Sequence, residues 1–148
     1  MTTVLASGVF DLLHYGHIRY LEEAKRRSGE DARLIVVVAR DETVMKRKGK
    51  RPVIPENQRR ALVEALEVVD EALLGYPEMD MSSVLLRIKP DIVAVGYDEE
   101  GIKRQLERIK AERGLDLRIE QIGRFGEEAL NSSSKIKRKI VEDWRKGL

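Results

Sequence analysis

The sequence predicts an α/β fold, with one domain built on a doubly wound parallel sheet of five strands. Short apolar runs alternate with longer segments in which apolar residues recur at helical spacing. The run at residues 34–38 holds five apolar residues, four of them β-branched, as expected of a strand buried on both faces. Strands that alternate with helices form right-handed βαβ units, which place helices on both faces of a parallel sheet.

The individual elements follow from these two patterns. Apolar residues recur at helical spacing at Ile18, Leu21 and Ala24, after a loop at residues 8–16. Pro55 suits the first turn of a helix, and Gly114 the end of one. We expect strands at residues 4–7, 34–38, 72–74, 92–95 and 117–122. We expect further helices at residues 55–66, 82–88 and 100–113, a last helix capped by Asn131 or Ser132 and ending near residue 145, and a polar, basic connection at residues 40–55.

The composition describes one globular domain, residues 1–148, and excludes several classes of protein. Charged residues make up 36% of the chain but leave a net charge of only +2, which argues against a dedicated nucleic-acid binder. Cysteine is absent, so disulfides and thiolate metal sites are excluded. No segment reaches the ~18 apolar residues of a membrane span, and the first residues lack the basic start of a signal peptide. We therefore expect a cytoplasmic protein that does not bind membranes.

Both histidines of the chain lie where the first loop becomes a helix, between Gly8 and His17. His14 and His17 have a spacing that can bind zinc, but zinc needs a third or fourth nitrogen or sulfur ligand, and no further histidine or cysteine exists. The alternative is phosphate chemistry, because a helix start offers free N–H groups and a partial positive charge. Gly8 and Gly16 would let a phosphate approach the backbone, and two imidazoles can donate hydrogen bonds to it. The glycines, the preceding strand and a later basic loop favour this second interpretation.

The segment from Gly8 to His17 resembles the signature G-T-F-D-x-x-H-x-G-H of the cytidylyltransferase-like nucleotidyltransferases, with Val9 in place of the common threonine. The resemblance continues through residues 40–43, 46–49, 55–60 and 89–98 and ends at residues 132–136, so it covers nearly the whole chain. Within the family, the chain looks most like archaeal FAD synthases, and next most like glycerol-3-phosphate cytidylyltransferases. The resemblance implies a Rossmann-like fold and the transfer of a nucleoside monophosphate to a phosphate-bearing acceptor, with release of pyrophosphate.

The resemblance to archaeal FAD synthases also implies substrates, a cation and site residues. The substrates would be ATP and FMN, together with Mg²⁺ or another divalent cation, and such relatives are often homodimers. His14, His17 and Lys46 would be catalytic. The nucleotide would be bound by the residues that match the motifs of the family: Gly8, Val9, Phe10, Asp11, His14, His17, Lys48, Gly96, Asp98, Arg124, Ser132 and Ser133. The ligands of the metal stay unassigned.

Several of these residues have a second interpretation. The five basic residues between Lys46 and Arg51 form either a clamp on triphosphate oxygens or a solvated basic turn. Asp98 either contacts a ribose hydroxyl or a metal, or it caps a helix. Asp11 either braces the motif or contacts Mg²⁺, and Arg59 lies either behind the basic loop or on the surface.

Two rival functions also remain. A polyol-phosphate cytidylyltransferase would carry the same motifs, because these motifs specify nucleotidyl transfer and say little about the identity of the acceptor. A non-catalytic nucleotide sensor could use the same fold, although sensing needs neither the histidine pair nor the lysine loop. An isoalloxazine ring usually has aromatic or broad apolar cover, for which the loops offer Tyr15, Tyr76, Tyr97 and Phe125.

Overall fold

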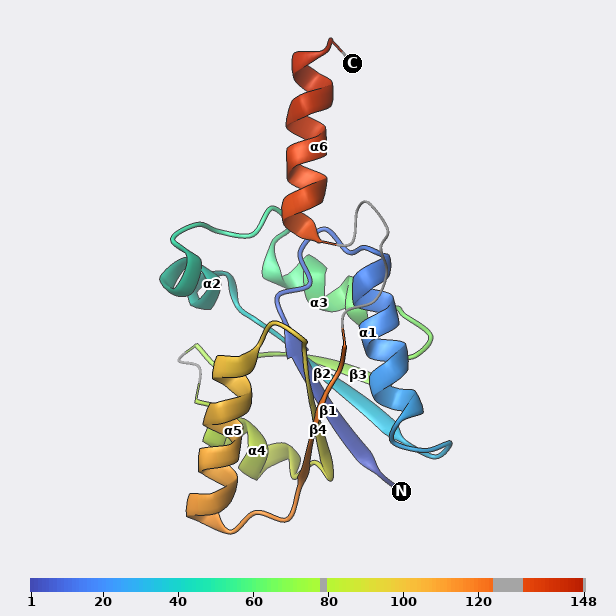
Figure 1. Cartoon of the computed structure of the whole chain (residues 1–148), viewed down its shortest axis with the longest axis vertical. Coiled ribbons are helices and arrows are strands. Elements are labelled where there is room, and N and C mark those ends of the chain that lie inside the picture. Colours follow the sequence, from blue (N-terminus) through green and yellow to red (C-terminus); the bar gives the residue numbers. More distant parts are fainter. Residues whose placement is uncertain (78–79, 124–131, 148) are drawn as a thin grey trace.

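The computed structural model describes residues 1–77, 80–123 and 132–147, and it shows helices packed on both faces of one parallel sheet (Figure 1). The described residues form five strands in the order β3-β2-β1-β4-β5, and all neighbouring pairs are parallel. The predicted fold class is confirmed. The strands are β1 (Thr3–Gly8), β2 (Arg33–Val38), β3 (Glu71–Leu74), β4 (Ile92–Val95) and β5 (Arg118–Gln121).

The strand order creates a switch point between β1 and β4. From β1 the chain builds outward to β2 and β3, and it then returns to the other side of β1 to form β4 and β5. The connections leave the sheet in opposite directions here, which opens a crevice beyond the carboxyl ends of the two strands. Gly8 ends β1 and Gly96 follows β4, so two of the predicted site segments meet at this crevice.

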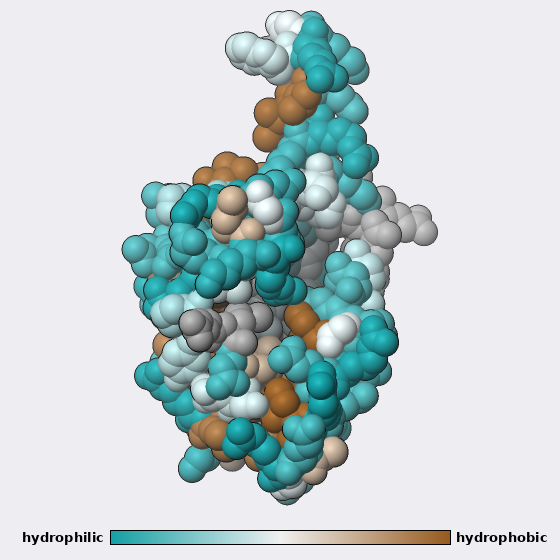
Figure 2. All heavy atoms as spheres, turned by 90° about the vertical axis from the view of Figure 1, so that its left-hand side faces the viewer, coloured by the Kyte–Doolittle hydropathy of each residue, from teal (hydrophilic) through white to brown (hydrophobic). Residues whose placement is uncertain are grey.

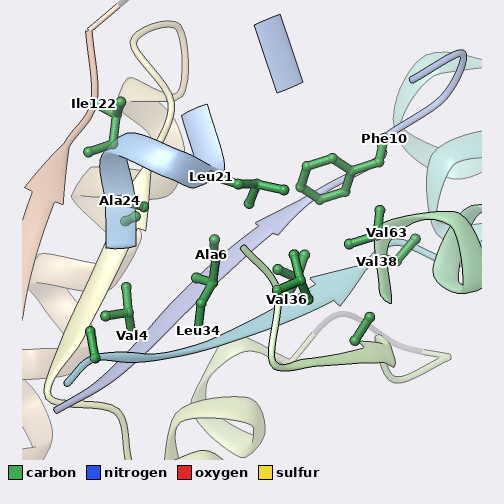
Figure 3. Packing of buried hydrophobic residues seen from close by; sticks show 14 of the residues in the cluster. Val4, Ala6, Phe10, Leu21, Ala24, Leu34, Val36, Val38, Val63 and Ile122 are labelled. Atoms are coloured by element: carbon green, nitrogen blue, oxygen red, sulfur yellow. The ribbon is translucent and has the colours of Figure 1, made fainter. Parts of the chain in front are cut away.

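Each face of the sheet buries its own core, because successive side chains of a strand point to opposite faces. On one face, Val4 and Ala6 of β1 pack with Leu21 and Val63 from two helices (Figure 3). On the other face, Leu5 packs with apolar residues of two further helices. The first pair of helices is α1 (Tyr15–Arg26) and α3 (Glu56–Glu64), and the second is α4 (Met81–Ile88) and α5 (Glu100–Arg113).

The polar, basic connection predicted at residues 40–55, which included no helix, is wrong in its first half, where helix α2 (Asp41–Lys48) lies. This helix buries only Thr43 and Val44, so it leaves no hydrophobic repeat in the sequence. It is stabilised instead by acidic residues in its first turn, basic residues in its last turn and a left-handed Gly49 at φ 75° that ends it. This order of charges, acidic at the start and basic at the end, was the feature of the sequence that indicated a helix.

The other bounds lie within two residues of the prediction, and those of β4 and α5 match it. Pro55 precedes α3 as its N-cap and does not lie within its first turn. Ser132 caps the last helix, α6 (Ser133–Arg145), because its hydroxyl accepts a hydrogen bond from the Lys135 N–H at 3.2 Å. Asn131, the other expected cap, lies outside the described residues. No helix among the described residues is long and apolar enough to cross a membrane.

Candidate active site

A cavity of about 550 Å³ opens at the switch point, beyond the carboxyl ends of β1 and β4. Its wall comes from the loop after β1, the start of α1, the segment after α2, the segment after β4 and the first turn of α6. Eleven of the residues predicted from the sequence line it: Gly8, Val9, Phe10, Asp11, His14, His17, Lys48, Gly96, Asp98, Ser132 and Ser133. Lys46 is not among the lining residues, and Arg124 lies outside the described residues.

The two histidines form one unit at the start of α1. His14 is the N-cap, in extended conformation, and its backbone N–H donates to His17 Nδ1 at 3.2 Å. The two rings stack with their centroids 3.7 Å apart. Because His17 Nδ1 accepts a hydrogen bond, the neutral ring carries its proton on Nε2. His17 therefore keeps one N–H donor for a ligand.

Burial keeps both imidazoles uncharged near neutral pH. Burial lowers the pKa of His17 to about 3, with a further decrease from His14 and an opposing increase from Asp11. Burial also lowers the pKa of His14. The pair can therefore donate hydrogen bonds to phosphate oxygens without two cations facing each other.

The lowered pKa of His17 predicts a specific loss of stability in acid. Between pH 6.5 and about 3 the unfolded chain binds a proton at His17 that the folded protein does not, so the free energy of unfolding falls as the pH decreases through this window. The contribution is at most about 1.4 kcal/mol per pH unit. His17→Asn retains an acceptor for the His14 N–H but does not titrate, so chemical denaturation at pH 7 and pH 4 should show a smaller loss for the variant. Equal losses in the two proteins would contradict the prediction.

Asp11 braces the motif against the segment that follows α2. Its side chain is buried, and its two carboxylate oxygens accept hydrogen bonds from the backbone N–H groups of Val53 and Ile54 at 2.8 and 2.9 Å. Lys137 Nζ lies 3.8 Å from the same carboxylate. The Ser133 hydroxyl donates to the Asp11 carbonyl at 2.5 Å. Of the two interpretations of Asp11, these contacts favour the brace over the Mg²⁺ ligand.

Arg59 is buried and lies behind the basic loop, with none of its side chain exposed to solvent. Its guanidinium donates to the carbonyls of Val9 and Ala39 at 2.7 and 2.8 Å, to the carbonyl of Ile54 at 2.7 Å, and to Asp41 Oδ1 at 2.6 Å. These partners belong to the motif loop, the end of β2, the segment before α3 and the start of α2. Arg59 therefore joins four parts of the site wall, and the alternative of a surface residue is wrong.

The basic segment divides into residues that face the cavity and residues that do not. Lys48, Lys50 and Arg51 line the cavity, whereas Lys46 is exposed on α2 outside the lining. Residues two apart on a helix project about 200° from each other, so α2 separates Lys46 from Lys48. Arg51 is paired with Glu42. Since the sequence prediction had no helix here, it could not separate the two lysines.

Gly8 supports the motif loop in a way that the sequence did not indicate. A Cβ atom at this position would lie 2.9 Å from Phe10 Cε2. The Phe10 ring in turn contacts the His17 ring, with centroids 5.3 Å apart. The absence of a side chain at Gly8 thus makes room for the aromatic ring that packs beside the histidine.

The segment after β4 brings two carboxylates to the cavity. Asp98 was predicted as a site residue. Glu99 beside it was missed, because an acidic residue at the start of a charged helix has an ordinary structural explanation. Burial, together with the neighbouring Asp98, raises the pKa of Glu99. A Cβ atom at Gly96 would lie 3.0 Å from Glu99 Oε1 and 3.2 Å from Asp98 Oδ1, so the glycine makes room for the pair. Of the aromatic candidates for ring cover, Tyr97 lines this cavity, Tyr15 and Tyr76 do not, and Phe125 lies outside the described residues.

The cavity wall carries side chains of both charges. Lys48, Lys50, Arg51 and Lys137 line it together with the start of α6, whose free N–H groups favour anions. Asp98 and Glu99 give the segment after β4 an acidic character that suits hydroxyl groups, amino groups or a hard cation. Among the described residues no group of three or more histidine, cysteine or acidic side chains is placed to hold a metal ion, so zinc has no complete ligand set in this part of the chain.

Comparisons with known proteins identify the family of the chain. The profile of the family described as "Cytidylyltransferase-like" matches residues 5–139. A protein of Methanopyrus kandleri named FAD synthase is 43% identical over 97% of this chain and 95% of its own length. An FAD synthase of Thermoplasma volcanium is 44% identical over 96% of each chain.

The solved structures extend the same comparison to the fold. A crystal structure described as a lipopolysaccharide core biosynthesis protein from Thermoplasma volcanium is 41% identical, with a TM-score of 0.77 over 85% of this chain and 99% of that chain. A structure from Archaeoglobus fulgidus, 19% identical with a TM-score of 0.64, covers 85% of this chain and 100% of its own and shares the fold.

Proposed function

Because this chain belongs to the cytidylyltransferase-like family and is similar over nearly its whole length to archaeal FAD synthases, we propose that it is an FAD synthase. It would transfer AMP from ATP to FMN and release pyrophosphate. The observation that carries this proposal is the pair of neutral histidines at the start of α1, in a cavity lined by both basic residues and carboxylates.

The proposed reaction is one in-line displacement. An oxygen of the FMN phosphate attacks the α-phosphorus of ATP, the bond from that phosphorus to the bridging oxygen breaks, and pyrophosphate leaves with the electron pair. No covalent intermediate is required, so the protein has to position the reactants and neutralise charge. His14 and His17 would each donate an N–H to oxygens whose negative charge increases in the transition state.

The residues present fit a Mg²⁺ ion that enters with the triphosphate. Mg²⁺ is usually held by one or two carboxylates together with phosphate oxygens and water, and Asp98 and Glu99 supply such a pair in the cavity wall. When bound, the cation would neutralise charge on the triphosphate and on the leaving pyrophosphate. Asp11 is less suited to this role, since both of its oxygens already accept backbone hydrogen bonds.

Within the basic segment we propose Lys48 as the main phosphate contact, although the resemblance also implies Lys46. Lys48→Ala should lower kcat/KM by at least about tenfold, because a point charge near the β- and γ-phosphates would be lost. Lys46→Ala, the matched control on the same helix, should change it by less. Steady-state kinetics with ATP as the varied substrate measures kcat/KM for both variants. A larger loss for Lys46→Ala than for Lys48→Ala would assign the main phosphate contact to Lys46.

The assay that tests the proposed function combines purified protein with FMN, ATP and Mg²⁺ and separates the products by chromatography. FAD and pyrophosphate in equal amounts are expected. A parallel reaction with CTP and glycerol phosphate tests the polyol alternative. Release of pyrophosphate in that reaction, with no FAD in the first, would assign the protein to the polyol-phosphate cytidylyltransferases. Nucleotide binding without turnover in either reaction would support the sensor.

A further inference from the structure

Helix α2 carries Lys48 to the cavity, but hydrophobic burial does little to hold this helix in place. It has eight residues and buries only Thr43 and Val44, neither of which belongs to the two cores of the sheet. Figure 2 views the molecule from the side on which α2 lies in Figure 1, and the surface there is mostly hydrophilic. A helix of this length is marginal at best in water on its own, so polar contacts must set the orientation of α2.

The starts of α2 and α3 cap each other. Neither N-cap residue, Arg40 or Pro55, caps its own helix with a side chain. Instead Glu56, the first residue of α3, accepts a hydrogen bond on Oε1 from the Asp41 N–H at 2.9 Å. Asp41, the first residue of α2, accepts one on Oδ2 from the Glu56 N–H at 3.4 Å. A carboxylate at each helix start satisfies a free N–H group and complements the partial positive charge there.

Two arginines complete a clasp that consists of Arg40, Asp41, Glu56 and Arg59. Arg40 Nη1 lies 3.2 Å from Glu56 Oε2, and Arg40 Nε donates to the Gly75 carbonyl at 2.6 Å. Arg59 Nη2 donates to Asp41 Oδ1 at 2.6 Å. The four side chains are between 0% and 34% exposed, so salt screens their charges less than those of surface pairs. The clasp thereby joins the base of α2 to α3 and to the chain that follows β3.

We propose that Glu56 is a positioning residue, which holds the base of α2 so that Lys48 at the other end faces the cavity. Lys48 lies seven residues after Asp41, about 10 Å along the helix axis. A tilt of about 10° at the base would therefore move the far end by about 2 Å, and a misplacement of about 1 Å can cost about 10²-fold in rate. This role rests on the proposed function, in which Lys48 contacts the triphosphate.

The contacts beyond α2 do not replace the clasp. Asp11 holds the N–H groups of Val53 and Ile54, which lie past the end of the helix. Arg51 pairs with Glu42, but both side chains are more than half exposed, and such surface pairs contribute little to stability. The orientation of α2 therefore depends mainly on its base.

Glu56→Ala should lower kcat/KM for ATP by about tenfold, because α2 loses its cap and its link to Arg40. Glu56 does not line the cavity, so the effect would reach the substrate through α2. Glu56→Gln keeps an oxygen for the Asp41 N–H and should recover part of the loss. Glu64→Ala is the matched control on α3, since Glu64 also accepts a backbone N–H, from Ala72 at 3.2 Å, and pairs with an arginine, Arg60, at 2.9 Å. The control should leave kcat/KM unchanged.

A double-mutant cycle separates positioning of Lys48 from a general structural role. If Glu56 acts through Lys48, Glu56→Ala should lower kcat/KM only slightly further in a protein that already carries Lys48→Ala. A purely structural effect would lower kcat/KM by the same factor with and without Lys48, and this outcome would overturn the proposal. So would wild-type kinetics of Glu56→Ala, or equal losses for Glu56→Ala and Glu64→Ala.

Amide hydrogen exchange tests the clasp without reference to turnover. The amides of α2 should exchange faster in Glu56→Ala than in the wild type, and at the wild-type rate in Glu64→Ala. Unchanged exchange in Glu56→Ala would refute the clasp. If the wild-type protein forms no FAD but exchange in α2 responds as expected, the proposed function is wrong and the clasp stands.

Discussion

His17→Asn is expected to lower kcat by about 10²-fold or more, the scale for the loss of one preorganised hydrogen-bond donor. The asparagine oxygen can accept the His14 N–H in place of Nδ1, so the start of α1 should stay folded. What the variant lacks is a donor at the position of Nε2. Affinity for ATP should change far less than kcat, because the donor serves charge that develops only in the transition state. Single-turnover measurements and ATP titrations check the two quantities.

His17→Gln is the matched comparison. Its side chain can place an amide N–H near the position of Nε2, but it cannot accept the His14 N–H in the same way. It should therefore retain more activity than His17→Asn and lose some stability. If His17→Asn turns over at nearly the wild-type rate, the histidine is a helix cap and has no part in the chemistry. His14→Ala is expected to lower kcat on the same scale.

Arg59→Met should lower the free energy of unfolding by about 3–5 kcal/mol, the range for removing one partner of a buried ion pair. The substitution leaves the carbonyls of Val9 and Ala39 and the carboxylate of Asp41 without their guanidinium donor. Because these groups belong to the wall of the cavity, kcat should fall as well, even under conditions in which the variant is folded. Denaturant unfolding and the FAD assay measure the two effects.

Arg60→Met is the control, on the same helix and one residue away. Arg60 forms an i,i+4 pair with Glu64 and donates to the Ala72 carbonyl, with its side chain 31% exposed. Its removal should cost about 1 kcal/mol or less and leave kcat unchanged. Equal effects of the two substitutions would mean that Arg59 does not organise the site. Arg59→Lys should recover only part of the stability, since one ammonium group cannot reach four acceptors in the geometry of the guanidinium.

The sequence by itself determined the class of the fold and the centre of the site. Runs of β-branched residues such as 34–38 specify buried strands through local backbone preference and burial. The segment from Gly8 to His17 predicted a helix start with both histidines at the site, because loop, cap and histidines are adjacent in the chain. Both kinds of signal are local, and for this reason five strands and five of the six helices in the described residues could be predicted.

Only the tertiary structure decided which residues work together. The sheet order sets β4 beside β1 and so brings Asp98 and Glu99 to the cavity that His14 and His17 line. Asp11 accepts hydrogen bonds from residues 42 and 43 positions away in the chain, and Arg59 donates one to Val9, 50 positions away. No local pattern encodes contacts at such separations. Lys48 and not Lys46 lines the cavity, because the rotation per residue of helix α2 sets the direction of each side chain. The physical reason is common to these cases: local sequence sets backbone conformation, whereas hydrogen bonds and charge contacts at the site depend on packing between segments that are distant in the chain.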